Sequence, residues 1–170
     1  AQGENALKMS YQSYVLASRL DDVLSLATAR LKKMSRGRYE MRRSLEVADR
    51  RQESGLAIEI LDHYSGSMRS VATLSGGESF LASLSLALGL ADAVQAHAGG
   101  IQMETIFIDE GFGTLDPEAL EMAFQALNDL QSGGRLVGVI SHVPDLKEMI
   151  KSRLEVTPGS RGSQARFVVD

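Results

Sequence analysis

Two short segments carry the residues with the clearest chemical potential. The segment Leu74-Ser75-Gly76-Gly77-Glu78 precedes a long apolar stretch, and the strand-like run Thr105-Ile106-Phe107-Ile108 leads into the carboxylates Asp109 and Glu110. The first suits a helix N-terminus that binds an anion through free N–H groups, and the second suits a magnesium site beside a base. A Gly-x-x-x-x-Gly-Lys-Ser/Thr loop, which would cradle nucleotide phosphates, is absent from the sequence. The residues therefore predict half of an ATP-hydrolysing site.

The first segment has two compatible interpretations. Ser75 and Glu78 have the spacing of a capping box, in which each side chain bonds the backbone N–H of the other residue. A cap does not explain Gly76 and Gly77, because consecutive glycines weaken a helix start unless another group must approach the backbone closely. We therefore predict that Ser75, Gly76, Gly77 and Glu78 form a nucleotide-binding motif, in which Ser75 and Gly77 hold the terminal phosphate.

The paired acids follow a buried strand, at the sheet edge where open α/β folds bind ligands. Asp109 is predicted to hold Mg²⁺, directly or through water, because this ion prefers oxygen ligands and keeps several waters. Glu110 is predicted to orient or deprotonate the attacking water. The alternative is a strand end with two solvated acids.

Two further residues complete the predicted site. Asp116 precedes Pro117 and suits a helix N-cap, or a contact across a dimer interface near the other site's water. His142 follows the apolar run 135–140, whose carboxyl end we expect at the same sheet edge as Glu110, and is predicted to sense the terminal phosphate. The alternative for His142 is an ordinary surface or core histidine.

The hydrophobic pattern predicts the elements that position these residues. A long helix is expected up to Met34, with a seam at residues 20, 24, 27, 31 and 34 that suits either the end of a coiled coil or an amphipathic helix packed on the domain. After Met34, the sequence predicts an antiparallel meander of strands over 36–47, 56–61 and 68–72. A helix over 76–97, a strand over 104–109, a helix over 117–131 and a strand over 135–140 are expected to follow. A short helix from 144 and a hairpin over 154–156 and 165–169 complete the prediction. The run 135–140 is expected to be buried on both faces, as in a parallel sheet.

Composition limits the classes of protein. The chain has 170 residues, 44% of them hydrophobic, which suits one domain with a real core. The net charge of −4 argues against a uniformly basic nucleic-acid binder, and the absence of cysteine excludes disulfides and cysteine-ligated metals. The apolar stretch 80–94 is too short to span a bilayer and no signal peptide is present, so we expect no membrane association and a cytoplasmic location.

Taken together, the motifs resemble the C-terminal half of an ATP-binding-cassette ATPase head. Ser75–Glu78 match the signature motif, Ile106–Glu110 the Walker B strand, Thr114–Asp116 the D-loop, and His142 the switch histidine. Gly111 and Phe112 stand where transporter cassettes usually have Pro-Thr, and this detail is similar to the SbcC/Rad50 family. The resemblance covers roughly Leu31 to the C-terminus.

The resemblance implies an α/β fold with an antiparallel β lobe, a helical signature lobe and part of a parallel sheet. Residues 1–34 would be the end of a coiled coil, and residues 35–170 the C-terminal half of the head. It implies ATP and Mg²⁺ as cofactors and an N-terminal head segment that carries the phosphate loop. A second head would form a homodimer, and an SbcD-type nuclease and double-stranded DNA would be partners in nucleoid-associated repair. This fragment alone is expected to be inactive.

Two alternatives stay open from the sequence. One is an SMC- or RecN-like structural chromosome ATPase without a nuclease, and the other is a plain interaction module that binds only its missing half. A basic cluster, predicted either as a solvated face or as a DNA or nuclease contact, comprises Lys32, Lys33, Arg36, Arg38, Arg42, Arg43, Arg50 and Arg51. On one strand, Arg36, Arg38 and Arg42 would share a face.

Overall fold

The computed structural model describes residues 11–44, 56–97, 103–160 and 162–169. In chain order its elements are α1 (Tyr11–Met34), β1 (Tyr39–Arg43), β2 (Ile58–Asp62), β3 (Ser67–Ser70), α2 (Gly76–His97), β4 (Thr105–Asp109), α3 (Pro117–Ser132), β5 (Leu136–Ile140), α4 (Pro144–Met149), β6 (Ser152–Thr157) and β7 (Gln164–Val169). Short 3₁₀ turns, η1 (Val71–Thr73) and η2 (Phe112–Thr114), precede α2 and α3. The predicted element order is therefore confirmed over the described residues.

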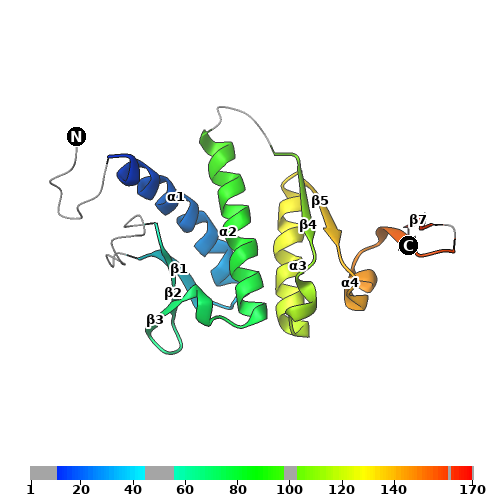
Figure 1. The fold of residues 1–170 in the computed structure, drawn as a ribbon, viewed down its shortest axis with the longest axis horizontal. Coiled ribbons are helices and arrows are strands. Elements are labelled where there is room, and N and C mark those ends of the chain that lie inside the picture. Colours follow the sequence, from blue (N-terminus) through cyan, green and yellow to red (C-terminus); the bar gives the residue numbers. More distant parts are fainter. Residues whose placement is uncertain (1–10, 45–55, 98–102, 161, 170) are drawn as a thin grey trace.

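The elements form three sheets around a helical centre. β1, β2 and β3 are an antiparallel meander, β4 and β5 a parallel pair, and β6 and β7 an antiparallel hairpin. Figure 1 shows the meander beside α1, with α2 in the middle, α3 next to it, and β4–β5 on the far side of α3. The hairpin lies at the end of the molecule, beyond α4. We call β1–β3 the β lobe.

The first strand is shorter than predicted, because a left-handed turn follows α1. Arg36 and Gly37 have φ of 51° and 81°, so the extended backbone begins only at Tyr39. Of the three arginines expected on one strand face, only Arg42 lies in β1. The predicted shared face is therefore wrong.

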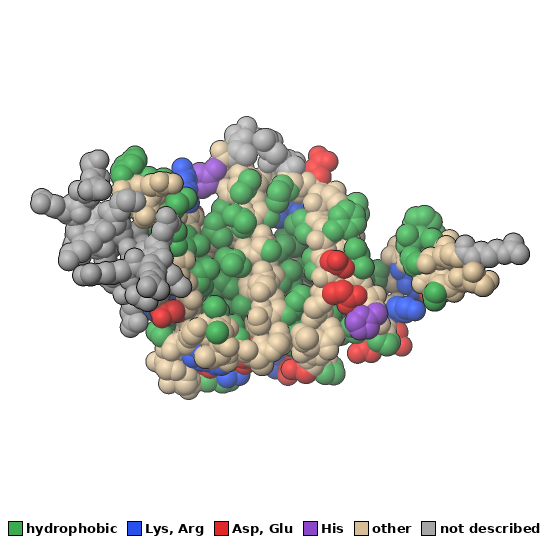
Figure 2. All heavy atoms as spheres, viewed as in Figure 1, with side chains coloured by type: hydrophobic (Ala, Val, Ile, Leu, Met, Phe, Trp, Pro, Cys, Tyr) green, Lys and Arg blue, Asp and Glu red, His purple; other side chains and the backbone are tan. Residues whose placement is uncertain are grey.

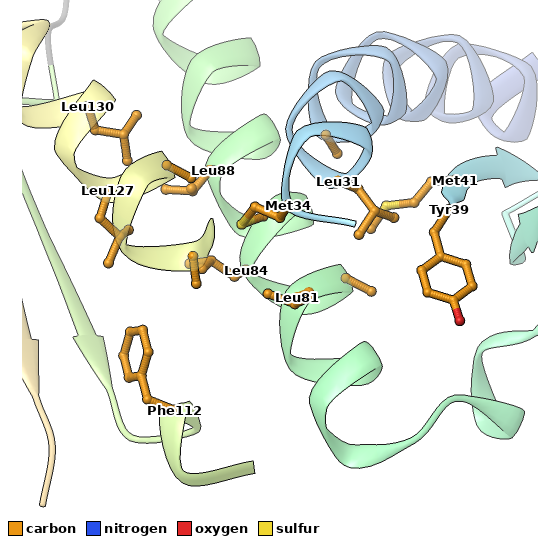
Figure 3. Packing of buried hydrophobic residues seen from close by; sticks show 14 of the residues in the cluster. Leu31, Met34, Tyr39, Met41, Leu81, Leu84, Leu88, Phe112, Leu127 and Leu130 are labelled. Carbon is orange, nitrogen blue, oxygen red and sulfur yellow. The ribbon is translucent and has the colours of Figure 1, made fainter. Parts of the chain in front are cut away.

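The predicted seam of α1 is part of the core. Leu24, Ala27, Leu31 and Met34 are buried, and they belong to one cluster with residues of β1, α2 and α3 (Figure 3). Gly89 of α2 permits this close crossing, because a Cβ there would stand 2.7 Å from the Ala27 nitrogen. The C-terminal half of α1 thus packs as an amphipathic helix on its own domain. Part of the predicted coiled-coil end, residues 1–10, lies outside the described residues.

The parallel pair is not buried on both faces, contrary to the prediction from its continuous apolar sequence. Ile106, Ile108, Val137 and Val139 pack against the core. On the opposite face Phe107, Leu136 and Ile140 are 70%, 61% and 54% exposed. Figure 2 shows hydrophobic side chains exposed beside these strands and along α2. Both faces of β4–β5 are apolar, but among the described residues only one of the two faces is covered.

The helix that contains the apolar stretch 80–94 spans residues 76–97, as predicted, and is therefore longer than that stretch. At 22 residues, α2 is the one helix among the described residues that is long and apolar enough to cross a membrane. It lies between α1 and α3 (Figure 1), and Leu81, Leu84, Ser85 and Leu88 are buried there. This packing identifies α2 as the central helix of the core.

Candidate functional site

The predicted capping box is present at the start of α2. The Glu78 N–H donates to Ser75 Oγ at 3.3 Å, and the Ser75 N–H donates to Glu78 Oε2 at 2.9 Å. These reciprocal bonds satisfy two of the N–H groups that a helix start leaves without partners. Between them, the N–H groups of Gly76 and Gly77 donate to no acceptor among the described residues. The motif therefore presents two free donors at the positive end of the helix dipole.

The two glycines have different surroundings. A Cβ on Gly77 would stand 2.9 Å from the Thr114 carbonyl oxygen, so the loop before α3 packs directly on this residue. A Cβ on Gly76 would meet only Thr114 side-chain carbons at an ordinary 3.6 Å. Packing within this chain thus explains why residue 77 is a glycine. The backbone of Gly76, which no side chain covers, suits the approach of a group from outside the chain.

The paired acids stand at the carboxyl end of β4, as predicted. Glu110 has a left-handed backbone with φ of 59°, and its N–H donates to the Ile140 carbonyl at 2.9 Å, which extends the pairing with β5 by one residue. Glu110 Oε2 lies 2.9 Å from His142 Nδ1. A positive φ is strained for a residue with a side chain, and such backbone is concentrated at functional sites. The structure thus brings together two residues that lie 32 positions apart in the sequence.

This edge is open to solvent. The side chains of Glu110 and His142 are 49% and 81% exposed, and Figure 2 shows acidic side chains next to a histidine in this region. The described residues contain no group of three or more metal-binding side chains. Two adjacent carboxylates nevertheless fit Mg²⁺, which commonly binds one or two carboxylates and completes its shell with water and phosphate oxygens. Asp109, the last residue of β4, is the residue that would hold it.

The loop between β4 and α3 connects this edge to the start of α2. At one end Gly113 lies beside His142, since a Cβ there would stand 4.0 Å from the ring Nε2. At the other end Thr114 contacts Gly76 and Gly77. Asp116 then caps α3 by accepting the Ala119 N–H at 2.8 Å. The sequence interpretation of Asp116 as an N-cap is therefore confirmed, and its contact across a dimer stays a prediction.

Phe80 is a residue of this region that the motifs did not reveal. Its ring lies against Gly111, where a Cβ would come within 2.3 Å of ring carbons, and it packs edge-on against the fully buried Phe112 with ring centroids 4.8 Å apart. Phe80 stands four residues after Gly76, on the same side of the helix. The one available signal was this spacing, together with a glycine directly after the second acid.

The basic cluster is paired within the chain. Each of its members among the described residues has an acidic neighbour: Lys32 with Glu40, Lys33 with Asp129, Arg36 with Glu118, Arg38 with Asp62 and Glu78, Arg42 with Glu40, and Arg43 with Asp21. Lys32 and Arg42 lower the pKa of Glu40 to about 2, although partial burial opposes this. The pairing favours the interpretation as a solvated face. Arg50 and Arg51 lie outside the described residues.

Comparison with known proteins decides the family. The family model for the SbcC/RAD50-like Walker B motif matches residues 45–129, which is half of the chain. The chain belongs to the SbcC/RAD50-like family. It is 56% identical over 168 residues to the SbcC component of nuclease SbcCD from Vibrio cholerae, and 47% identical over 165 residues to that of Staphylococcus haemolyticus. These alignments cover 99% and 97% of this chain but only 17% and 16% of the relatives.

Solved structures agree on the fold. A structure from work on ATP-driven dimerization and DNA-stimulated activation of SMC ATPases superposes with a TM-score of 0.68 at 17% identity. The match covers 92% of this chain and 89% of that one. The chain therefore has the fold of the C-terminal part of an ABC-type ATPase head, as predicted.

Proposed function

We propose that this SbcC/Rad50-like chain is one half of an ATPase head. Residues 1–34 are the end of a coiled coil whose last turns, with Leu24, Leu31 and Met34, pack on the head. Residues 35–170 are the C-terminal half of the head. An N-terminal head segment of the same protein supplies the phosphate-binding loop, and a second head completes a homodimer. ATP closes the two heads, and hydrolysis opens them.

The observation that carries this proposal is the pairing of Glu110 with His142 on a strained turn at the end of β4. The two side chains lie within hydrogen-bonding reach of each other. Glu110 supplies a carboxylate suited to orienting and deprotonating water, and His142 supplies an imidazole suited to sensing the terminal phosphate. Asp109 holds Mg²⁺, which neutralises charge on the phosphates when bound. Ser75, Gly76, Gly77 and Glu78 form the surface offered to a nucleotide that the second head holds, and Asp116 lies at the contact between the heads.

The relatives' name supports a role beside a nuclease. Because they are named as part of nuclease SbcCD, we propose that head closure controls an SbcD-type nuclease that cuts double-stranded DNA ends and hairpins in the cytoplasm, at the nucleoid. A structural chromosome head of the SMC type is the second candidate, since such heads share the fold. DNA cleavage by the purified SbcD-type partner separates the two: ATP-dependent stimulation by this protein supports the first, and its absence supports the second.

The central experiment mixes this chain with a segment that carries a phosphate-binding loop and measures ATP hydrolysis. We expect turnover well above that of either component alone. The Glu110→Gln variant should reduce turnover by about two to four orders of magnitude, the usual range for loss of a general base. Because the neutral amide of this variant would still allow nucleotide binding, closed dimers should accumulate, which size-exclusion chromatography with ATP detects.

Glu104→Gln is a control for loss of an exposed carboxylate, since Glu104 directly precedes β4, at the opposite end of the strand from Glu110. It should leave turnover within about twofold of the unmodified mixture, as expected for a surface change away from the site. Unchanged turnover in Glu110→Gln would contradict the catalytic assignment. No gain from mixing the two segments would contradict the composite head itself.

A further inference from the structure

We propose that Tyr39 is a positioning residue for the motif Ser75–Glu78. Its hydroxyl fixes the Glu78 carboxylate within the helix cap, so that the N–H groups of Gly76 and Gly77 stay available to a nucleotide phosphate. This inference rests on the proposed function, which places that phosphate at the start of α2. It assigns Glu78 to holding the motif in shape.

Both carboxylate oxygens of Glu78 are engaged inside the chain. Oε2 accepts the Ser75 N–H at 2.9 Å, as part of the capping box. Oε1 accepts the hydroxyl of Tyr39, a residue of β1 that is only 4% exposed. Figure 3 shows the Tyr39 ring extending from β1 toward the segment that leads into α2. A capping box needs only the bond to Ser75, so the bond to Tyr39 is an additional constraint that comes from the β lobe.

Arg38, directly before β1, and Arg69 of β3 reinforce this constraint. Arg38 Nη1 lies 3.7 Å from Glu78 Oε1, and Arg69 Nη2 lies 3.9 Å from Oε2. Both guanidinium groups also contact the buried Asp62, Arg38 at 3.1 Å and Arg69 at 3.4 Å. Arg69 further donates to the Thr73 carbonyl at 2.6 Å, directly before the motif. Tyr39 of β1 and Arg69 of β3 therefore hold the motif on both sides of Ser75, and Asp62 of β2 holds the two arginines.

The charge states suit this role. Burial, followed by the hydrogen bond to Glu78, raises the pKa of Tyr39 to about 12, so its hydroxyl remains a donor at any physiological pH. Burial acts to raise the pKa of Glu78, but the bonds from Tyr39 and Ser75 and the nearby Arg69 outweigh it and hold this pKa below its usual value. Glu78 therefore accepts the Tyr39 hydroxyl as an ionised carboxylate. Such a charge-assisted hydrogen bond is stronger than one between two neutral groups.

The fixed position of the Glu78 carboxylate matters because it stands beside the proposed phosphate site at the start of α2. A phosphate bound to the first N–H groups of α2 would be repelled by a free carboxylate in the same turn. Tyr39 and the arginines hold the Glu78 charge on the side of the β lobe and partly neutralise it. Without the Tyr39 hydroxyl, Glu78 loses its inner partner and competes with the phosphate for the same helix end. Nucleotide-dependent contact between heads should then weaken, while chemistry at Glu110 should not change.

The test uses the reconstituted head, formed from this chain and the segment with the phosphate loop, and compares Tyr39→Phe with Tyr64→Phe. Tyr64 is the matched control, because its ring also lies beside the Arg38 guanidinium, at 5.1 Å against 4.7 Å for Tyr39, yet Tyr64 is 75% exposed and does not bond Glu78. We expect Tyr39→Phe to raise the ATP concentration for half-maximal dimerization and hydrolysis about tenfold, with kcat within about twofold. Tyr64→Phe should leave both values unchanged.

A double variant then asks whether Tyr39 acts through Glu78. In the Glu78→Ala background, Tyr39→Phe should add no further loss, because the acceptor is already gone. Equal behaviour of Tyr39→Phe and Tyr64→Phe would overturn the proposal, as would an additive loss in the double variant or a fall in thermal stability without a change in KM. If the unmodified head neither hydrolyses ATP nor dimerizes with it, the proposed function fails instead.

Discussion

Gly76 and Gly77 are neighbours in the motif, yet only Gly77 is required by the packing of this chain. A methyl group at Gly77 would press on the Thr114 carbonyl oxygen at 2.9 Å, whereas one at Gly76 would find ordinary contacts at 3.6 Å. The first change disturbs the fold, and the second disturbs only what approaches from outside. The two positions therefore separate the structural role of the motif from its proposed binding role.

We predict opposite outcomes for alanine at these positions in the reconstituted head. Gly77→Ala should lower the free energy of unfolding by about 1–3 kcal/mol, the usual cost of overpacking. Gly76→Ala should leave thermal stability unchanged or slightly higher, since alanine favours a helix, but should weaken ATP-dependent dimerization about tenfold by covering a donor. Thermal melts and dimerization assays with ATP measure the two effects. Normal dimerization in Gly76→Ala would contradict the phosphate-binding role.

At the scale of elements, the sequence predicted most reliably those features that depend on residues close together in the chain. The starts of α2 and α3 followed from the caps Ser75 and Asp116, whose partners lie three residues away. The bond between Tyr39 and Glu78 joins residues 39 positions apart, and no periodicity reports such a contact. The paired acids and His142 could be predicted as a site only because parallel strands bring their carboxyl ends to one edge. The left-handed backbone of Arg36 was not predicted, because nothing in an arginine side chain favours that conformation.

The junction between the β lobe and α2 should be sensitive to acid. The hydrogen bond from Arg38 is the main cause that lowers the pKa of Asp62 to about 2, below the 3.8 of an unperturbed carboxyl. The unfolded chain therefore binds a proton first as the pH falls, so the stabilising contribution of Asp62 is complete above about pH 5 and is lost toward pH 2. Asp62→Asn should flatten this decline without removing it, because Glu40 has a similarly low pKa.

Urea midpoints measured between pH 6 and about pH 2.5 test this expectation, since the midpoint shifts with stability when the slope is constant. Asp145→Asn, in the exposed first turn of α4, provides the control and should keep the decline of the unmodified chain. A decline of the same steepness in Asp62→Asn would exclude Asp62 as a source of the acid sensitivity. The β lobe would then owe its attachment to apolar packing, with the ion pairs contributing little.

At the scale of the whole molecule, the open face of β4–β5 could not be predicted from the sequence. Continuous apolar strands indicate burial on both faces, but they do not tell which chain provides the second layer. A parallel pair of strands is too small to be stable without further strands or packing on its faces. Here α3 and the core cover Ile106 and Val139, while Phe107 and Leu136 remain exposed. The split head that we propose accounts for this difference, because the other segment would supply the missing layer.

The open face should therefore close when the segment with the phosphate loop is added. We predict that amide hydrogen exchange in β4 and β5 slows by at least about tenfold on mixing, because burial and added strand pairing suppress local opening. Phe107→Thr should weaken association of the two segments but leave this chain folded, since the ring is already 70% exposed. Tyr64→Thr removes an aromatic ring of similar exposure, 75%, from the β lobe and should leave association unchanged. If exchange in β4 and β5 stays constant while the mixture gains ATPase activity, the second segment must bind elsewhere, and the exposed face would belong to another contact.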